Sequence, residues 1–244
     1  VTISDLSAVV TGLLLAFNLP AGLPVWMSLV GAFIAIVIIK QLFGGLGYNF
    51  ANPAIVGRIA MALGFTGAMT SYTYPENGID ALASATPLAV EETAQNAGSY
   101  VTLLLGNHGG VLGETCAITL LIGGIYLIWT KVISPTIPVT YLATVAVLSL
   151  VSGRDPIYQL LSGGLMLGAF FMATDYVTSP TTTKGKIVFG LGLGVITCAI
   201  RFLGTMNEGV SFAILLMNLL TPYIDKFTMT KPLGAKPIKQ KEEA

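Results

Sequence analysis

Apolar runs dominate the pattern of positions along this chain. Eight continuous apolar stretches, separated by short polar or Gly/Pro-containing connections, cover most of its length: residues 6–19, 24–43, 53–70, 111–130, 137–152, 157–173, 187–204 and 209–225. Continuous runs of this kind are typical of helices that span or enter a membrane. We therefore predict an all-α, polytopic membrane helical bundle of about eight membrane segments, forming a single integral membrane domain over residues 1–244.

Several of these runs are too short for a simple helical crossing, which needs about 20 residues. The first ends at Asn18-Leu19-Pro20, and proline or glycine stands at many of the other boundaries. Short, interrupted segments are typical of discontinuous helices, whose broken backbone is tolerated only inside protein or beside a cavity. The alternative is a thin, tilted bundle with tight turns.

Two echoes in the sequence favour an internal repeat of inverted topology, which is a common transporter architecture. Gly31-Ala32-Phe33 and Gly168-Ala169-Phe170 lie in similar apolar surroundings. The glycine- and asparagine-containing stretch GGLGYNFANP precedes one helix, as ATDYVTSPTTTKGK precedes another. In a chain rich in glycine and alanine, a three-residue match also arises by chance, so both interpretations stay open.

Composition supports the membrane assignment and excludes other classes. Only 10% of the 244 residues are charged, whereas a soluble domain carries about 25%. Twelve Lys and Arg balance twelve Asp and Glu, which excludes an electrostatic nucleic-acid binder because that function needs a basic excess. The high hydrophobic share excludes intrinsic disorder.

The placement of the charges predicts an orientation. With eight segments, ten of the twelve Lys and Arg residues fall on the side of both termini, and only Arg154 and Arg201 fall on the other. The positive-inside rule then places the termini, including a polar tail over residues 226–244, in the cytoplasm. The long loop 71–110 carries four carboxylates and no Lys or Arg, and we expect it to be extracytoplasmic.

This loop contains a threonine in an unusual setting. The small residues Ala83, Ser84 and Ala85 precede Thr86 and leave its hydroxyl unshielded, and Pro87 biases Thr86 toward an extended backbone. Such a threonine is an accessible attachment point for a bulky group. An ordinary turn or helix-capping threonine is the alternative interpretation.

Three carboxylates border apolar runs. They are Asp5, Glu114 and Asp175, and a carboxylate inside a membrane is costly enough to be a functional candidate. Asp175 lies within the Thr174–Pro180 segment, where hydroxyls and the carbonyls freed by a helix break offer oxygen ligands for a small cation. The alternative is that each carboxylate reaches the lipid headgroups.

Long stretches of the chain resemble one family. They are SAVVTGLLLAFNLP, IIKQLFGGLGYNFANPAIVGR, SATPL, GGVLGETCAITLLIGGIYLIW, LLSGGLMLGAFFMATDYVTSPTTTKGK and GVSFAILLMNLLTPYIDKF. Together, over roughly residues 4–228, they resemble the RnfD proteins of the Rnf complexes, the ion-translocating ferredoxin:NAD oxidoreductases of bacteria. They are also similar to the corresponding membrane protein of the sodium-pumping NADH:quinone reductase.

The resemblance implies a covalent flavin. Asp80, Ala85 and Thr86 fit the family's Asp-x-x-x-x-Ala-Thr acceptor motif, which also brings Ser84 and Pro87 into the site, and FMN would be attached to Thr86 through a phosphoester. The motif usually has Ser or Thr three residues before the attachment threonine and often Gly two before. Here those positions hold Ala83 and Ser84, and Ser84 is a competing attachment site.

The family also has two further N-terminal helices, which would make a ten-helix protein. The resemblance implies that polar residues at the ends and breaks of the membrane segments serve sodium or proton uptake, or a pocket for a non-covalent flavin, either riboflavin or FMN, with the break around Asp175 on the cytoplasmic side. These residues are Asp5, Asn49, Asn52, Glu114, Asp175, Thr178 and Ser179.

The function implied by the resemblance is electron transfer, coupled to sodium or proton translocation, within a larger complex in the bacterial inner or plasma membrane. Its partners would include a second flavin subunit and iron–sulfur subunits. This chain shows no ferredoxin or NAD site of its own. The competing interpretation is a channel or secondary transporter for a small solute, without redox activity.

Overall fold

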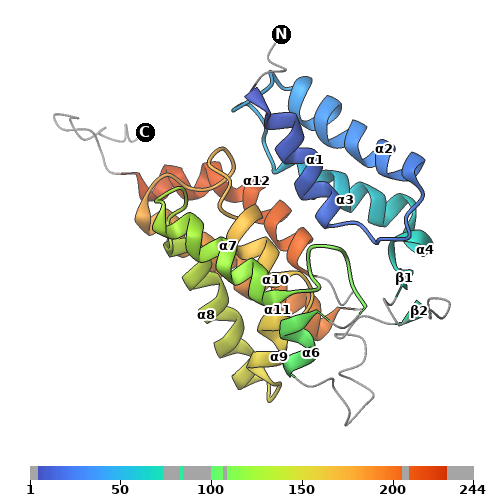
Figure 1. Ribbon diagram of the computed structural model, residues 1–244. Helices are drawn as coiled ribbons and strands as arrows, with labels where there is room; N and C mark the ends of the chain where they lie inside the picture. The colour runs from blue at the N-terminus through green and yellow to red at the C-terminus, as the bar shows by residue number, and fades with distance from the viewer. Residues whose placement is uncertain (1–4, 74–82, 85–99, 107–108, 205–208, 230–244) are drawn as a thin grey trace, which may run out of the picture.

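The computed structural model describes residues 5–73, 83–84, 100–106, 109–204 and 209–229, and its regular elements are helices except for one pair of very short strands (Figure 1). The first part of the chain contains α1 (Ser7–Phe17), α2 (Val25–Phe33), the π-helix η2 (Ile34–Gln41), α3 (Pro53–Gly64), α4 (Thr66–Met69) and β1 (Tyr72–Thr73).

The second part begins with β2 (Ala83–Ser84) and continues with α6 (Tyr100–Leu105), α7 (Ala117–Trp129), α8 (Thr136–Val151), α9 (Pro156–Leu161), α10 (Leu165–Leu167), the π-helix η3 (Gly168–Met172), α11 (Thr183–Leu203) and α12 (Val210–Thr228). In Figure 1 the N-terminal helices form one group and the helices from α6 onward a larger one. Helix α3 packs against α12 and joins the two groups.

Close helix packing in the larger group depends on glycine. Helix α11 packs along α8 and α12, and a Cβ at Gly190 or Gly194 of α11 would overlap Thr140 or Thr144 of α8. Small residues let membrane helices approach until their backbones are in contact range. The sequence GLGLG in α11 is therefore a packing surface.

The predicted all-α membrane bundle with discontinuous helices is confirmed. Two helices in the described residues, Thr183–Leu203 and Val210–Thr228, are long and apolar enough to cross a membrane, and five others are apolar but shorter. Large apolar side chains such as Leu29, Ile125 and Leu150 are more than half exposed. Exposed side chains of this kind are expected where lipid replaces water as the solvent.

The apolar runs are interrupted at more positions than the sequence indicates. The predicted run 157–173 divides into α9, α10 and η3, because Gly163 and Gly164 adopt left-handed φ values of +66° and +67° that stop a right-handed helix. The run 111–130 becomes helical only at Ala117, and the run 53–70 divides at Phe65.

The segment 71–110 was expected to be non-helical, and this is wrong for Tyr100–Leu105, which forms α6. Near its start, β1 and β2 pair antiparallel, with Tyr72 opposite Ser84. Asp80, Ala85, Thr86 and Pro87 lie outside the described residues, so for these four the flavin-acceptor motif stays a prediction.

The repeated Gly-Ala-Phe triplets have a structural counterpart. The first ends α2 immediately before η2, and the second opens η3. Both therefore lie where a membrane helix widens from α to π hydrogen bonding, a feature that is frequent at functional sites.

Candidate functional site

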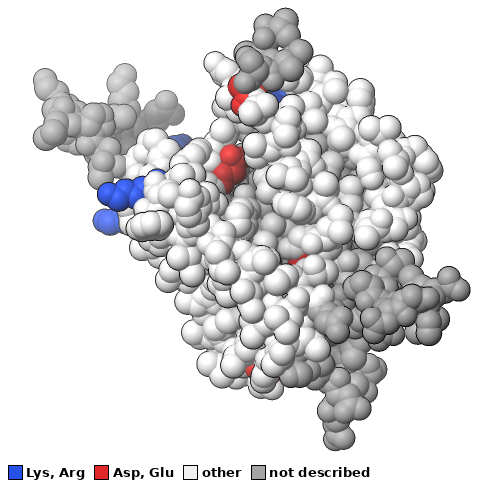
Figure 2. Space-filling model, viewed as in Figure 1, with Lys and Arg blue, Asp and Glu red and all other residues white. Residues whose placement is uncertain are grey.

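A cleft of about 510 Å³ lies between the two groups of helices. One wall comes from α1 and η2, the floor from the start of α3, and the other wall from η3 and the end of α7. Figure 2 shows acidic atoms at a hollow in a face that otherwise carries few charges. The volume of the cleft is within the range of small-molecule and cofactor sites, about 300–1,000 Å³.

The cleft collects four of the polar residues that the sequence analysis singled out. Asp5, Asn49, Asn52 and Asp175 all line it, although they come from three separate segments of the chain. Lys40 of η2, one of the ten cations counted on the side of the termini, lines it as well.

Asp175 lies in the connection between η3 and α11. The hydroxyl of Thr178 donates to its Oδ2 at 2.9 Å, and the Ser179 N–H donates to its backbone carbonyl at 3.1 Å. Burial raises the pKa of the Asp175 carboxyl, while hydrogen bonds from Thr178, the Val177 N–H and Asn49 oppose that rise. Thr178 and Ser179 thus shape the turn that presents Asp175.

Asn52 forms the floor and is held from three directions. Its Oδ1 accepts from the N–H of Ala54 at 3.1 Å and caps α3. Its Nδ2 donates to the carbonyl of Met172 at 3.2 Å, across the two groups of helices. Its own N–H donates at 3.0 Å to Asn218 of α12, whose amide in turn donates to the Thr178 carbonyl at 3.2 Å.

The remaining polar groups are at the mouth and side of the cleft. Asn49 is buried, and its Nδ2 donates to the Ala51 carbonyl at 3.0 Å. The ammonium of Lys40, a residue only 4% exposed, is attracted by the carboxylates of Asp5 and Asp175. Asp5 precedes α1, and the backbone N–H and hydroxyl of Ser7 lower the pKa of its carboxyl.

Most of the remaining lining is apolar and includes Leu127, Ile133, Phe170, Phe171 and Val177, with the hydroxyls of Ser7, Thr11, Thr174 and Tyr176 as further polar groups. An isoalloxazine ring has one edge of hydrogen-bond donors and acceptors and one apolar end. The cleft offers amide, carboxylate and ammonium groups as well as aromatic and aliphatic side chains, so its residues fit a flavin ring.

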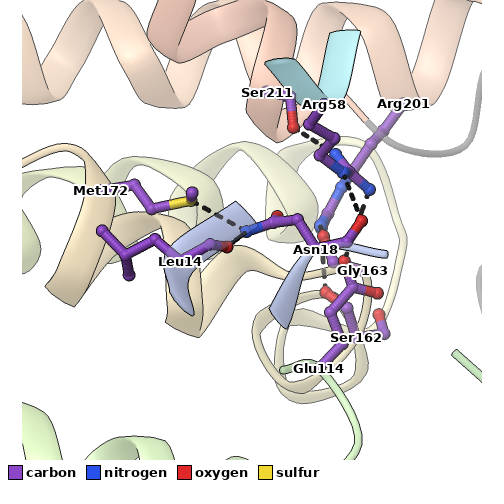
Figure 3. A network of polar contacts seen from close by, with 9 residues as sticks. All are labelled: Leu14, Asn18, Arg58, Glu114, Ser162, Gly163, Met172, Arg201 and Ser211. Carbon is purple, nitrogen blue, oxygen red and sulfur yellow. Dashed lines mark hydrogen bonds and ion pairs between the residues drawn. The ribbon is translucent and has the colours of Figure 1, made fainter. Parts of the chain in front are cut away.

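Glu114 does not lie in the cleft. The residue is 6% exposed, its carboxylate abuts Gly164, and it forms an ion pair of 3.7 Å with Arg58 Nη2. It belongs to a second polar cluster, shown in Figure 3, that also contains Arg201.

Sequence reasoning missed the role of both arginines in this cluster. It counted Arg58 and Arg201 only as charges on opposite sides of the membrane, with Arg58 at most one turn inside the bilayer, but the two residues are 6% and 5% exposed. The available signal was that each stands inside an apolar run, within IVGRIAM and CAIRFLG. Ionisable residues within membrane helices almost always face the bundle interior.

Two relatives share much of this chain's sequence. A protein of the Na⁺-translocating ferredoxin:NAD⁺ oxidoreductase complex of Acetobacterium woodii is 48% identical over 248 residues, covering all of this chain and 78% of that protein. A protein of the proton-translocating ferredoxin:NAD⁺ oxidoreductase complex of Clostridium ljungdahlii is 44% identical, covering 97% of this chain and 77% of that protein.

A third relative and a family model agree with them. A protein of the ion-translocating oxidoreductase complex of Alcanivorax borkumensis is 38% identical, covering 96% of this chain and 77% of that protein. The sequence model of the NQR2, RnfD, RnfE family matches residues 1–234. With a family match over nearly its whole length and relatives at this level of identity, the chain belongs to the NQR2, RnfD, RnfE family.

Proposed function

We propose that this chain is the electron-relaying membrane subunit of an ion-translocating ferredoxin:NAD⁺ oxidoreductase complex. Relatives at 48% and 44% identity belong to complexes of that description, one with sodium and one with protons as the transported ion. Its partners would be the other subunits of the complex, including a second flavin subunit and iron–sulfur subunits. The complex would lie in the bacterial inner or plasma membrane, with this chain's termini in the cytoplasm.

The relay would use two flavin positions. FMN bound through a phosphoester on Thr86 would be the outer one, on the extracytoplasmic loop. Ser84, the competing attachment residue, pairs through its backbone with Tyr72 of the strand that follows α4.

The cleft would be the inner position, holding a non-covalent flavin. The single observation that carries this step is the convergence of Asn49, Asn52 and Asp175 in a cleft whose remaining lining is largely apolar. Asn52 and Asn49 would hold the ring edge, Asp175 would accept a ring N–H, and Lys40 would offset negative charge. A bound flavin supplies chemistry that links one- and two-electron transfer, while the protein sets its position and potential.

The decisive experiment concerns Thr86. We expect the chain, coexpressed with a flavin transferase, to show flavin fluorescence on a denaturing gel and one FMN-phosphoester on the peptide containing Thr86 by mass spectrometry. Thr86→Val should abolish both signals, and Ser84→Ala should keep them.

One result would count against the relay, and another would change its attachment residue. An unmodified Thr86 in the presence of the transferase would favour the solute channel or transporter. Fluorescence that survives Thr86→Val but disappears in Ser84→Ala would move the attachment to Ser84.

A further inference from the structure

Two helices of this chain end inside the protein, and an arginine from another helix caps each end. Helix α9 ends at Leu161, and the chain breaks at Ser162–Gly164 before α10. Arg201 of α11 donates to the freed carbonyls of Ser162 and Gly163 at 3.0 and 3.1 Å. It also donates to the carbonyl of Gln159 at 2.8 Å.

The end of α1 is arranged in the same way. The carbonyls of Phe17 and Leu19 accept from the N–H groups of Gly113 and Leu112 at 2.7 and 3.4 Å. The carbonyl between them, that of Asn18, accepts from Nε of Arg58 at 3.4 Å. The guanidinium of Arg58 also donates to the hydroxyl of a serine on α12, Ser211, so it joins three helices.

The two capped ends belong to one cluster. Glu114 forms an ion pair with Arg58 at 3.7 Å, and its carboxylate lies against Gly164. Gly164 directly follows Gly163, whose carbonyl accepts from Arg201. In Figure 3 both guanidinium groups point toward this region. Glu114, Arg58 and Arg201 thus surround the same helix break.

This cluster lies behind the floor of the cleft. Asn52 lines the cleft, and Arg58 follows it by six residues on the same helix, about 9 Å further along the axis. A cation leaving the cleft along α1 or α3 toward the opposite end of the bundle would meet the cluster next.

The C-terminal ends of broken helices are where membrane transporters coordinate small cations, through freed carbonyl oxygens and the negative end of the helix dipole. In this chain guanidinium N–H groups of Arg58 and Arg201 donate to carbonyl oxygens at such helix ends. Each guanidinium also carries a permanent positive charge, since arginine does not deprotonate in proteins. Fixed arginines are also used to exclude cations and protons from membrane pores.

We propose that Arg58 and Arg201 form a cation-excluding plug that closes this subunit to sodium ions and protons behind the cleft. Electrons need no coordinating oxygens and can pass between cofactors across such a layer. The transported ion would then cross the complex by a route outside this plug. Glu114 would serve as a counter-charge that holds Arg58 in place, and not as an ion ligand.

The test is passive sodium permeability of the assembled complex in proteoliposomes, measured as ²²Na⁺ uptake under an imposed potassium diffusion potential, without redox substrates. We expect the wild-type complex to be tight and Arg201→Gln to raise uptake by about tenfold or more, because one fixed charge is removed from a low-dielectric interior. Arg58→Gln should do the same and serves as the second variant if Arg201→Gln does not assemble.

Two controls separate the charge from general damage. Lys184→Gln removes a cation from the exposed first turn of the same helix as Arg201 and should leave uptake at the wild-type level. Arg201→Lys disturbs the cap but keeps the charge, and it should also stay tight.

Several outcomes would overturn the plug. One is an assembled Arg201→Gln or Arg58→Gln complex that is as tight as Lys184→Gln. Another is an Arg201→Lys complex that leaks as much as Arg201→Gln. A third is a Glu114→Gln complex whose turnover needs markedly more sodium, because that would make Glu114 an ion ligand. The permeability measurements need no redox turnover and therefore no flavin at Thr86, so the plug and the relay fail separately.

Discussion

At the scale of single residues, the most constrained positions are those where backbone and charge meet inside the bundle. Gly164 has φ +67°, and a Cβ at this position would overlap the Glu114 carboxylate. The glycine is therefore required twice, once for its backbone conformation and once to let a buried carboxylate approach.

Gly164→Ala should lower stability by about 2–4 kcal/mol, because backbone strain adds to displacement of a buried charge. The measurement is thermal unfolding of the purified protein in detergent. Gly153→Ala is the matched control, since Gly153 has φ +70° but nothing lies within 4 Å of its added Cβ. Equal losses in both variants would show that contact with Glu114 contributes nothing.

At the scale of elements, capping side chains decide where the membrane helices begin. Asn52, Asp155 and Thr182 each cap a helix through a side-chain oxygen. Thr182 also donates to Thr228 Oγ1 at 2.9 Å, and so ties the start of α11 to the end of α12. The sequence indicated helices in these regions but not these links, because a cap is local and its tertiary partner is 46 residues away.

Thr182→Ala should lower the free energy of unfolding by about 1–2 kcal/mol, because the Gly185 N–H loses its acceptor at 3.0 Å and Thr228 loses a partner. Thermal unfolding and the rate of proteolysis near residue 182 would both report it. Thr182→Ser keeps the hydroxyl and should stay within a few tenths of a kcal/mol of wild type. A serine variant as unstable as the alanine variant would assign the effect to the lost methyl group.

At the scale of the whole molecule, the cleft exists because the chain returns to itself. Asp5 and Asp175, far apart in sequence, line the same cleft as Lys40, and the bond from Asn52 to Met172 joins the two groups of helices. This arrangement supplies both hydrogen-bonding and apolar walls for one ligand.

Asp175→Ala should reduce acid-extractable flavin about tenfold relative to covalent flavin, because a buried charge-assisted hydrogen bond is lost. The ratio is the flavin fluorescence of the acid extract divided by the flavin fluorescence of the denatured protein that remains. Asp225→Ala, which removes a carboxylate that binds the Thr181 N–H outside the cleft, should leave the ratio unchanged. Unaltered extractable flavin together with a shifted sodium requirement would make the cleft an ion-uptake site.

The sequence alone determined the class of this protein. Long apolar runs with few charges specify membrane helices because an unpaired backbone group or charge in lipid is costly wherever the chain folds. The same reasoning singled out Asp5 and Asp175 as carboxylates bordering apolar runs, the resemblance added Asn49 and Asn52, and the structure places all four in one cleft.

Only the tertiary structure decided which polar residues face each other. Arg58 and Glu114 lie on different segments of the chain and pair through space. Arg201 caps the end of a helix, α9, from a position 42 residues after Gln159. Hydrophobic periodicity records which face of a helix is buried, but not which buried groups meet, because that depends on how the helices pack. The division between a polar cleft and an arginine-capped interior therefore became visible only in the folded chain.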